Sequence, residues 1–153
     1  MNVHPATLSD FNALISLARE VEHLFGPMAE EESFRNALKS AISDGLVYCA
    51  RDNAGDTPAL GGIVISKAAN EILWFAVSVR HQNRGYGRAL LDVAVARLDS
   101  RRDIRVQTFD ASVSDGIPAR RLYTDSGFSD HEDGGPNPAG IPTVIMRLPG
   151  TRG

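Results

Sequence analysis

The stretch that most constrains the fold runs from Gln82 to Arg88, QNRGYGR, where an apolar strand pattern gives way to helical spacing. It contains two glycines and two arginines. The start of a helix has backbone N–H groups without partners and a partial positive charge, and glycine lets a ligand approach the backbone closely. The pattern therefore predicts a loop that holds a phosphate or pyrophosphate at the start of a helix. The alternative is a strand-to-helix turn that needs glycine only for its backbone conformation, with both arginines in solvent.

Two common nucleotide-binding loops do not fit this stretch. The P-loop requires a Gly-Lys pair, and the chain contains none. The dinucleotide fingerprint requires a third glycine where this chain has Leu90, and it belongs at a first strand rather than in mid-chain. The expected phosphate ligand must therefore be held by another kind of loop.

Composition narrows the class of protein. A chain of 153 residues is expected to form one domain, residues 1–153. Its net charge of -3 disfavours nucleic acid as a partner, and no apolar run approaches the roughly 20 residues of a membrane span. Without a secretory signal pattern at its start, the chain is expected to be cytoplasmic and to have no membrane partner. The four histidines lack metal-ligand spacing, so no metal site is expected.

The single cysteine, Cys49, lies in the apolar stretch LVYCA. One cysteine excludes an internal disulfide. We expect a small buried hydrophobe at this position, with a reactive thiol as the alternative.

Hydrophobic periodicity predicts alternating helices and strands in one mixed α/β layer structure. The expected strands cover 2–7, 46–51, 58–67, 71–79, 105–110 and 143–148, the helices cover 11–25, 30–43, 87–98 and 118–126, and a hairpin turn covers 52–56. The strand at 71–79 is apolar at both parities, which predicts a central strand covered on both faces. Residues 130–140 are rich in turn formers and are expected to be a loop.

Two motifs together resemble a known family. Gln82–Gly87, QNRGYG, is similar to the Q/R-x-x-G-x-G/A signature of the GNAT superfamily of N-acetyltransferases, and Pro118–Phe128, PARRLYTDSGF, resembles that family's A-x-x-L-Y-x-x-x-G-F segment. Their order and separation also agree. The resemblance implies an α/β (α+β) fold with a mixed, mostly antiparallel central sheet, flanking helices and splayed central strands. It also implies acetyl-CoA, or coenzyme A, as cosubstrate.

The resemblance also assigns residues to the cofactor. The glycine loop would hold the pyrophosphate, the end of the preceding strand would pair with the pantetheine arm, and a helix residue would line it. These residues are Asn83, Arg84, Gly85, Tyr86, Gly87 and Arg88 of the loop, Ala76, Val77, Ser78 and Val79 of the strand, and Ala119 of the helix. The chain departs from the family at Gly116, where an asparagine commonly binds the cofactor arm.

Acetyl transfer to an amine requires a base, donors for the oxyanion and an acid for the departing thiolate. By the resemblance, Tyr123 is the acid and the N–H of Val77 is the oxyanion donor. Glu71 lies eleven residues before Gln82, like the general base of the histone-acetyltransferase branch. A packed tyrosine and a solvated carboxylate at a strand start are the respective alternatives.

The acceptor region is expected to include His23, Phe25 and Trp74, although a helix-end histidine is the alternative for His23. The predicted function is an N-acetyltransferase that moves the acetyl group of acetyl-CoA to a primary amine by direct attack in a ternary complex. The acceptor is a small molecule or a peptide amine. The alternative is a non-catalytic module that binds coenzyme A or a partner protein. The oligomeric state stays open, with a homodimer among the alternatives.

Overall fold

The computed structural model of the protein describes residues 1–52 and 57–151, so residues 53–56 of the expected hairpin turn lie outside the described residues. Seven strands form one sheet, and every neighbouring pair is antiparallel except β4 and β5. In spatial order they are β1 (Asn2–Pro5), β2 (Val47–Arg51), β3 (Gly61–Ser66), β4 (Glu71–Val77), β5 (Ile104–Phe109), β7 (Pro142–Leu148) and β6 (Ser129–Pro136). This mixed, mostly antiparallel sheet confirms the expected fold class.

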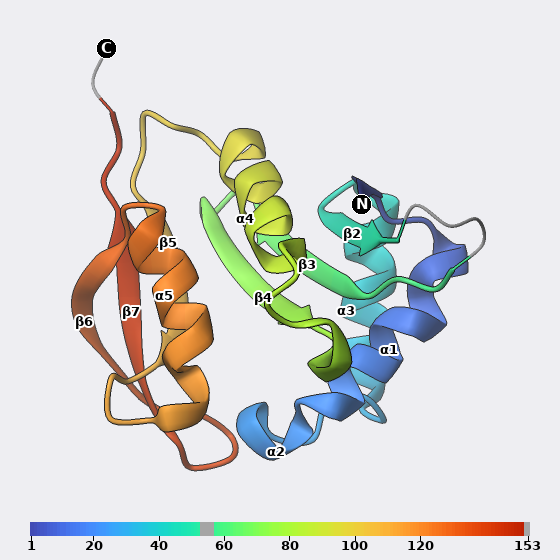
Figure 1. Ribbon diagram of the computed structural model, residues 1–153, viewed down its shortest axis with the longest axis horizontal. Coiled ribbons are helices and arrows are strands. Elements are labelled where there is room, and N and C mark those ends of the chain that lie inside the picture. The colour runs from blue at the N-terminus through green and yellow to red at the C-terminus, as the bar shows by residue number, and fades with distance from the viewer. Residues whose placement is uncertain (53–56, 152–153) are drawn as a thin grey trace.

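Helices cover both faces of the sheet (Figure 1). They are α1 (Phe11–Glu20), α2 (Glu22–Phe25), α3 (Glu32–Ser43), α4 (Tyr86–Arg97) and α5 (Ile117–Asp125), with short 3-10 turns at Leu8–Asp10, Val79–His81 and Ser114–Gly116. Ile63 and Ile65 of β3 belong to the core under α4 and α5, whereas Val64 belongs to the core under α1 and α3. Because strand side chains alternate, the two helix groups lie on opposite faces.

The sheet opens in its middle. β4 and β5 pair only at Glu71–Arg105 and Ile72–Val106. Beyond these pairs, β4 remains paired with β3, and β5 remains paired with β7. Figure 1 shows the two groups of strands diverging, with α2 near the wide end of the gap. The expectation of splayed central strands is therefore confirmed.

Asn70 fixes the closed end of this splay. It is only 1% exposed, and its side-chain amide donates to the carbonyls of Asp99 and Asp103, both at 3.0 Å. Its side-chain oxygen accepts the N–H of Asp99 at 2.8 Å, and its backbone carbonyl accepts the N–H of Arg105 at 3.3 Å. One buried side chain thus connects the start of β4 to the segment that leads into β5.

The wide end of the splay is bridged by α2 and the loop between β6 and β7. Asn137 in that loop donates its side-chain N–H to the carbonyl of Leu24 at 2.7 Å. Phe25 packs on Phe109 at the end of β5, with 5.1 Å between ring centroids. Gly26 lies so close to Pro138 that an added Cβ would be 2.8 Å from the proline Cβ. The two halves are consequently tied together at both ends.

The prediction of a loop at 130–140 is wrong for residues 130–136, because β6 pairs with β7 from Ser129 to Pro136. The register skips His131 and Gly134, and most side chains of the strand are exposed. An edge strand with two irregularities tolerates glycine, proline and charged residues that a central strand does not. Its turn-like composition reflects this position at the edge.

Three other boundaries or environments differ from expectation. The helix expected over 11–25 is interrupted at Val21, which has φ -109°, and the strand expected over 71–79 ends at Val77. β4 is central in the sheet, as predicted, but the expectation that both faces are covered is wrong because Leu73 is 56% exposed. Val64 pairs with Trp74 and Ile65 with Ile72, which leaves Leu73 as the extra residue of a β-bulge beside the opening.

Cys49 is fully buried on β2, as expected for a small hydrophobe. Burial disfavours the thiolate and raises the pKa of the thiol to about 12. The thiol is therefore neutral and inert at physiological pH.

Two further searches concern only the part of the chain that the structure describes. No helix there is long and apolar enough to cross a membrane. No group of three or more His, Cys, Asp or Glu side chains lies together there in a way that would hold a metal ion.

Candidate active site

A cavity of about 710 Å³ occupies the space between the diverging strands. Its walls come from α3, β4, β5, α5 and the loop between β6 and β7. A second hollow of about 340 Å³ lies at the closed end of the splay and includes Glu71. Ile72, Leu73, Val106 and Gln107 line both, so the two hollows adjoin.

Tyr123 of α5 forms one wall of the large cavity. The residue is 3% exposed, and its ring packs edge-on against Phe75 and Phe128, with centroids 6.1 and 5.6 Å away. Burial disfavours the phenolate and raises the pKa of Tyr123 well above its usual range. None of the hydrogen bonds among the described residues uses its hydroxyl. Tyr123 is thus a neutral donor beside the cavity, and Ala119 lines the same wall one turn earlier.

The edge of β4 that faces the cavity carries unpaired backbone groups. Ser78 donates its N–H to the carbonyl of Leu60, 2.7 Å away on the β3 side. Since backbone N–H groups alternate in direction along a strand, the N–H groups of Phe75 and Val77 point to the opposite edge, toward the opening. The sequence analysis predicts the N–H of Val77 as the oxyanion donor. It does not predict Phe75, although the alternation of N–H groups also directs the N–H of Phe75 toward the opening.

Of the four predicted strand residues, Ser78 and Val79 lie just past the end of β4. Val79 donates its N–H to the carboxylate of Glu20 at 3.4 Å, and the Ser78 hydroxyl donates to the same oxygen at 3.4 Å. Ala76 is buried. Within this segment, Val77 is the residue whose N–H faces the opening.

The glycine loop has the geometry of an anion site. Asn83 and Gly85 have positive φ values of 62° and 89°, and α4 starts at the next residue, Tyr86. Ala89 donates to the carbonyl of Gly85 at 3.0 Å, whereas no described acceptor bonds to the N–H groups of Tyr86, Gly87 or Arg88. These three N–H groups at a helix start are available to an anion.

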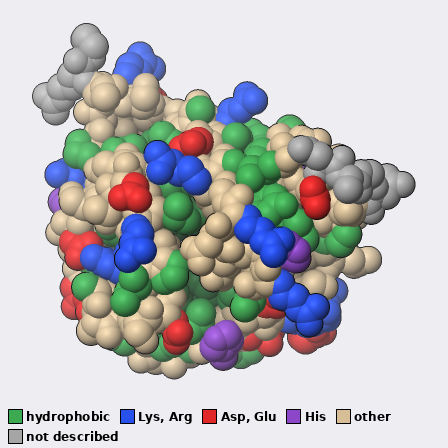
Figure 2. All heavy atoms as spheres, in the orientation of Figure 1, with side chains coloured by type: hydrophobic (Ala, Val, Ile, Leu, Met, Phe, Trp, Pro, Cys, Tyr) green, Lys and Arg blue, Asp and Glu red, His purple; other side chains and the backbone are tan. Residues whose placement is uncertain are grey.

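The arginines of the loop add charge next to this helix start. Arg84 and Arg88 are both exposed. Arg88 forms an ion pair with Asp92, one turn later, at 3.4 Å, and such an exposed pair contributes little to the stability of the fold. Figure 2 shows positive, negative and apolar side chains interspersed on the face that carries α4 and α5. Local charge at the loop, and not a broadly basic face, is therefore what favours a phosphate here.

Gly87 lies close to side chains of the neighbouring elements. A Cβ at this position would lie 2.9 Å from the Leu122 side chain and 3.6 Å from Phe75 and Val77. The start of α4 therefore approaches α5 and β4 closely. A substitution at Gly87 would disturb this contact before it tested a ligand.

Gly116, the departure from the family pattern, has a structural cause in this chain. An added Cβ would lie 2.5 Å from the Cβ of Phe109 and 2.9 Å from its ring. Phe109 in turn packs on Phe25 at the wide end of the cavity. An asparagine at position 116 would not fit beside Phe109 without displacing this aromatic pair.

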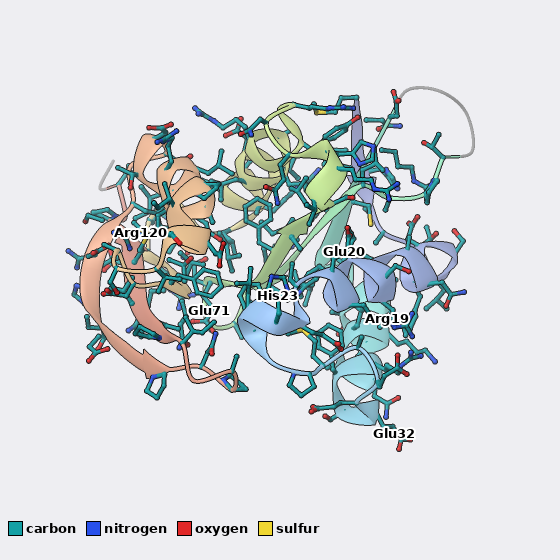
Figure 3. All side chains as sticks on the ribbon, turned by 60° about the horizontal axis from the view of Figure 1, so that its bottom comes forward. Arg19, Glu20, His23, Glu32, Glu71 and Arg120 are labelled. Carbon is teal, nitrogen blue, oxygen red and sulfur yellow. The ribbon has the colours of Figure 1, made fainter. Side chains whose placement is uncertain are left out.

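Three carboxylates near the site lie in different surroundings, and Figure 3 labels two of them, Glu20 and Glu71. Glu71, at the start of β4, lines the smaller hollow together with Arg105 and Gln107. Glu20 belongs to α1 and lines neither hollow. Glu22 accepts the N–H of Ala29 at 3.1 Å and so supports the loop after α2. Glu71 is the sequence-predicted carboxylate that adjoins the cavity.

The structure brings together two of the three predicted acceptor residues. Phe25 and Trp74 both line the cavity. His23 is exposed on α2 and is not among the lining residues, so its contact with an acceptor stays a prediction. Sequence reasoning missed Phe34 and Leu73, which also line the cavity. The spacing of Phe34 and Leu38 predicts a helix, but it does not indicate that this helix lines a cavity.

Comparison with known proteins decides the family. The family model of the acetyltransferase (GNAT) domain matches residues 43–130, which include the glycine loop and α5. The chain belongs to the GNAT acetyltransferase family. A search of curated proteins found no match.

Solved structures share this GNAT fold over nearly the whole chain. A GNAT-family acetyltransferase from Bacillus cereus is 18% identical over 99% of this chain and 98% of its own, with a TM-score of 0.72. The ribosomal-protein-S18-alanine N-acetyltransferase of Escherichia coli is 18% identical over 99% and 95%, with a TM-score of 0.70. A Salmonella typhimurium protein solved with its cofactor acetyl-CoA is 14% identical over 100% and 95%, with a TM-score of 0.77. At these identities the likeness shows the fold.

The first prediction concerns the loop arginines. Replacing both Arg84 and Arg88 by alanine should weaken coenzyme A binding roughly tenfold, because charge-assisted bonds to phosphate are lost. The folded state should persist, since both side chains are exposed. Calorimetry at two salt concentrations measures the effect. Arg101→Ala, at an 83% exposed side chain beyond the other end of α4, is the control and should bind normally. Equal affinity in the double variant would contradict a phosphate role for the loop.

A second prediction tests the contact at Gly116. Gly116→Asn should lower the free energy of unfolding by about 1–3 kcal/mol, because Phe109 must move. Gly45→Asn is the matched control: nothing lies within 4 Å of a Cβ there, and asparagine tolerates the positive φ of 73°. Urea denaturation compares the two. Similar stabilities would show that Phe109 does not exclude a side chain at position 116.

Proposed function

We propose that this GNAT domain transfers the acetyl group of acetyl-CoA to a primary amine by direct attack in a ternary complex. The observation that carries this proposal is the arrangement across the splay. The unbonded hydroxyl of Tyr123 lies on one wall of the cavity, and the free N–H edge of β4 lies on the other. Acyl transfer needs a proton donor and an oxyanion site close together, and this cavity offers both.

The residues fit acetyl-CoA as a cosubstrate. Its pyrophosphate matches the free N–H groups of Tyr86, Gly87 and Arg88 at the start of α4. Its extended arm matches the unpaired edge of β4, whose backbone groups would otherwise lack partners. When bound, acetyl-CoA would supply an activated acetyl group as a thioester. A structure with similar fold from Salmonella typhimurium holds this cofactor, which supports the assignment.

The chain's own groups then have distinct roles. The N–H of Val77 stabilises negative charge on the carbonyl oxygen. Tyr123 donates its proton to the departing sulfur. Glu71 lies six residues before Val77 on β4, so it takes the proton from the attacking amine by way of water in the hollow that adjoins the cavity.

The acceptor class is tested by thiol release. Acetyl-CoA is mixed with the protein and a panel of polyamines, amino acids, arylalkylamines and peptides, and free thiol is followed. Amine-dependent release supports the enzyme. Tight cofactor binding without release from any amine would favour a non-catalytic module that binds coenzyme A.

The third prediction concerns Tyr123. Tyr123→Phe keeps the ring contacts with Phe75 and Phe128 but removes the proton donor, so turnover should fall by roughly 10²-fold while cofactor affinity holds. The control is Tyr48→Phe, at a tyrosine buried on β2 outside both hollows. Single-turnover kinetics isolates the chemical step. An unchanged chemical rate would leave Tyr123 with a packing role only.

A fourth prediction concerns Glu71. An amine with a pKa near about 10 is mostly protonated at neutral pH and cannot attack until it loses a proton. Glu71→Gln should therefore lower turnover by roughly 10²-fold near pH 7, and the loss should shrink as rising pH supplies free amine. The measurement is a pH–rate profile on one acceptor. Glu32→Gln, at an exposed residue of α3, is the control (Figure 3). Parallel profiles for Glu71→Gln and the parent would exclude Glu71 as the base.

A further inference from the structure

Leu73 is an exposed leucine in the middle of the sheet. The β-bulge leaves it without a partner on β3, and no strand pairs with β4 beyond Ile72 on the other side. It is 56% exposed and lines both the large cavity and the smaller hollow. An apolar side chain held at the junction of two hollows is placed to contact whatever fills them.

On the side of the large cavity, the wall around Leu73 is mostly apolar and is shaped by small residues. On α3, Ser33, Ala37 and Ala41 follow one another at intervals of four and line the cavity, which leaves room between the helix and β4. Larger apolar side chains complete the wall: Phe25, Met28, Phe34, Leu38, Trp74 and Phe109. The space therefore suits a bulky apolar group.

Charge is scarce in the large cavity. Among the described residues, Glu31 is the charged side chain that lines the large cavity, and it is exposed. Glu71 and Arg105 are the charged side chains of the smaller hollow. Several buried ammonium groups would need several carboxylates to offset their desolvation. These walls can accept one amine, which is neutral when it attacks, but not a polycation.

We propose that the acceptor is a primary amine with a single basic group on an apolar body, and that Leu73 contacts this body and sets the preference for it. The inference rests on the proposed transferase function and narrows its substrate class. A free arylalkylamine and the apolar first residue of a peptide present the same chemistry. Overall negative charge alone would instead favour cationic acceptors in general.

The experiment compares 2-phenylethylamine, a Leu-Gly-Gly peptide amide and spermidine as acceptors. The parent protein should have a kcat/KM at least tenfold higher for one or both apolar amines than for spermidine. A preference for the free amine or for the peptide identifies the source of the acceptor. Leu73→Ala should raise KM for the preferred apolar amine roughly tenfold, with kcat within about twofold, because apolar contact is lost away from the reacting atoms. Leu73→Glu should shift the preference toward spermidine.

Leu8→Ala is the matched control, because Leu8 is a 60% exposed leucine that lines neither hollow. It should leave all three KM values unchanged. A parent preference for spermidine, or equal KM values in Leu73→Ala and Leu8→Ala, would overturn the inference. A change in the molar mass of Leu73→Ala by light scattering, with unchanged KM, would also overturn it, because Leu73 would then lie between copies of the chain.

A binding measurement separates this inference from the proposed function. 2-Phenylethylamine and spermidine are titrated separately into protein saturated with coenzyme A, and binding is followed by calorimetry. Failure of every amine to release thiol would count against the transferase alone. Binding of 2-phenylethylamine that weakens roughly tenfold in Leu73→Ala would still support the apolar site. Tighter binding of spermidine than of 2-phenylethylamine would refute it.

Discussion

The two residue pairs that join β4 to β5 are the constraint on which the site depends. Because pairing stops after Ile72 and Val106, the backbone N–H groups of Phe75 and Val77 face the opening, and no backbone acceptor among the described residues bonds to them. A ligand that accepts from these groups would supply the pairing that β5 does not. Asn70 fixes the closed end, and the contacts of α2 with the loop between β6 and β7 fix the wide end. The opening between β4 and β5 is therefore a cavity that is held by contacts at both of its ends.

The parts of this fold that follow local rules could be predicted from sequence. The glycine loop, the start of α4 and the position of Tyr123 on α5 depend on residues within one or two turns, and both motifs carry that information. β6 could not be predicted in the same way, because edge position and register irregularities at His131 and Gly134 permit a composition that resembles a loop. Pairing partners, and not local propensity, decide such a strand.

The environments of the site residues depend on contacts between distant parts of the chain. The bulge at Leu73 changes which face each residue of β4 occupies, and periodicity alone gives no sign of it. The aromatic pair of Phe25 and Phe109 joins segments 84 positions apart, and Asn137 bonds to Leu24 across 113 positions. Gly116 is explained by its contact with Phe109, which leaves no room for a Cβ and which the sequence does not reveal. Sequence reasoning thus identified the catalytic candidates and two residues of the apolar wall, Phe25 and Trp74, but it missed Phe34 and Leu73.

The nucleophiles available near the cavity bear on whether acetyl transfer takes one step or two. A covalent acetyl carrier would need an activated side chain, most readily a thiolate. The only cysteine of the chain is fully buried on β2, lines neither hollow and has a pKa of about 12. Ser33 lines the cavity, but no histidine among the described residues does so to activate it. The amine is then the strongest nucleophile that can reach the thioester, which favours both ligands being held in the cavity at once.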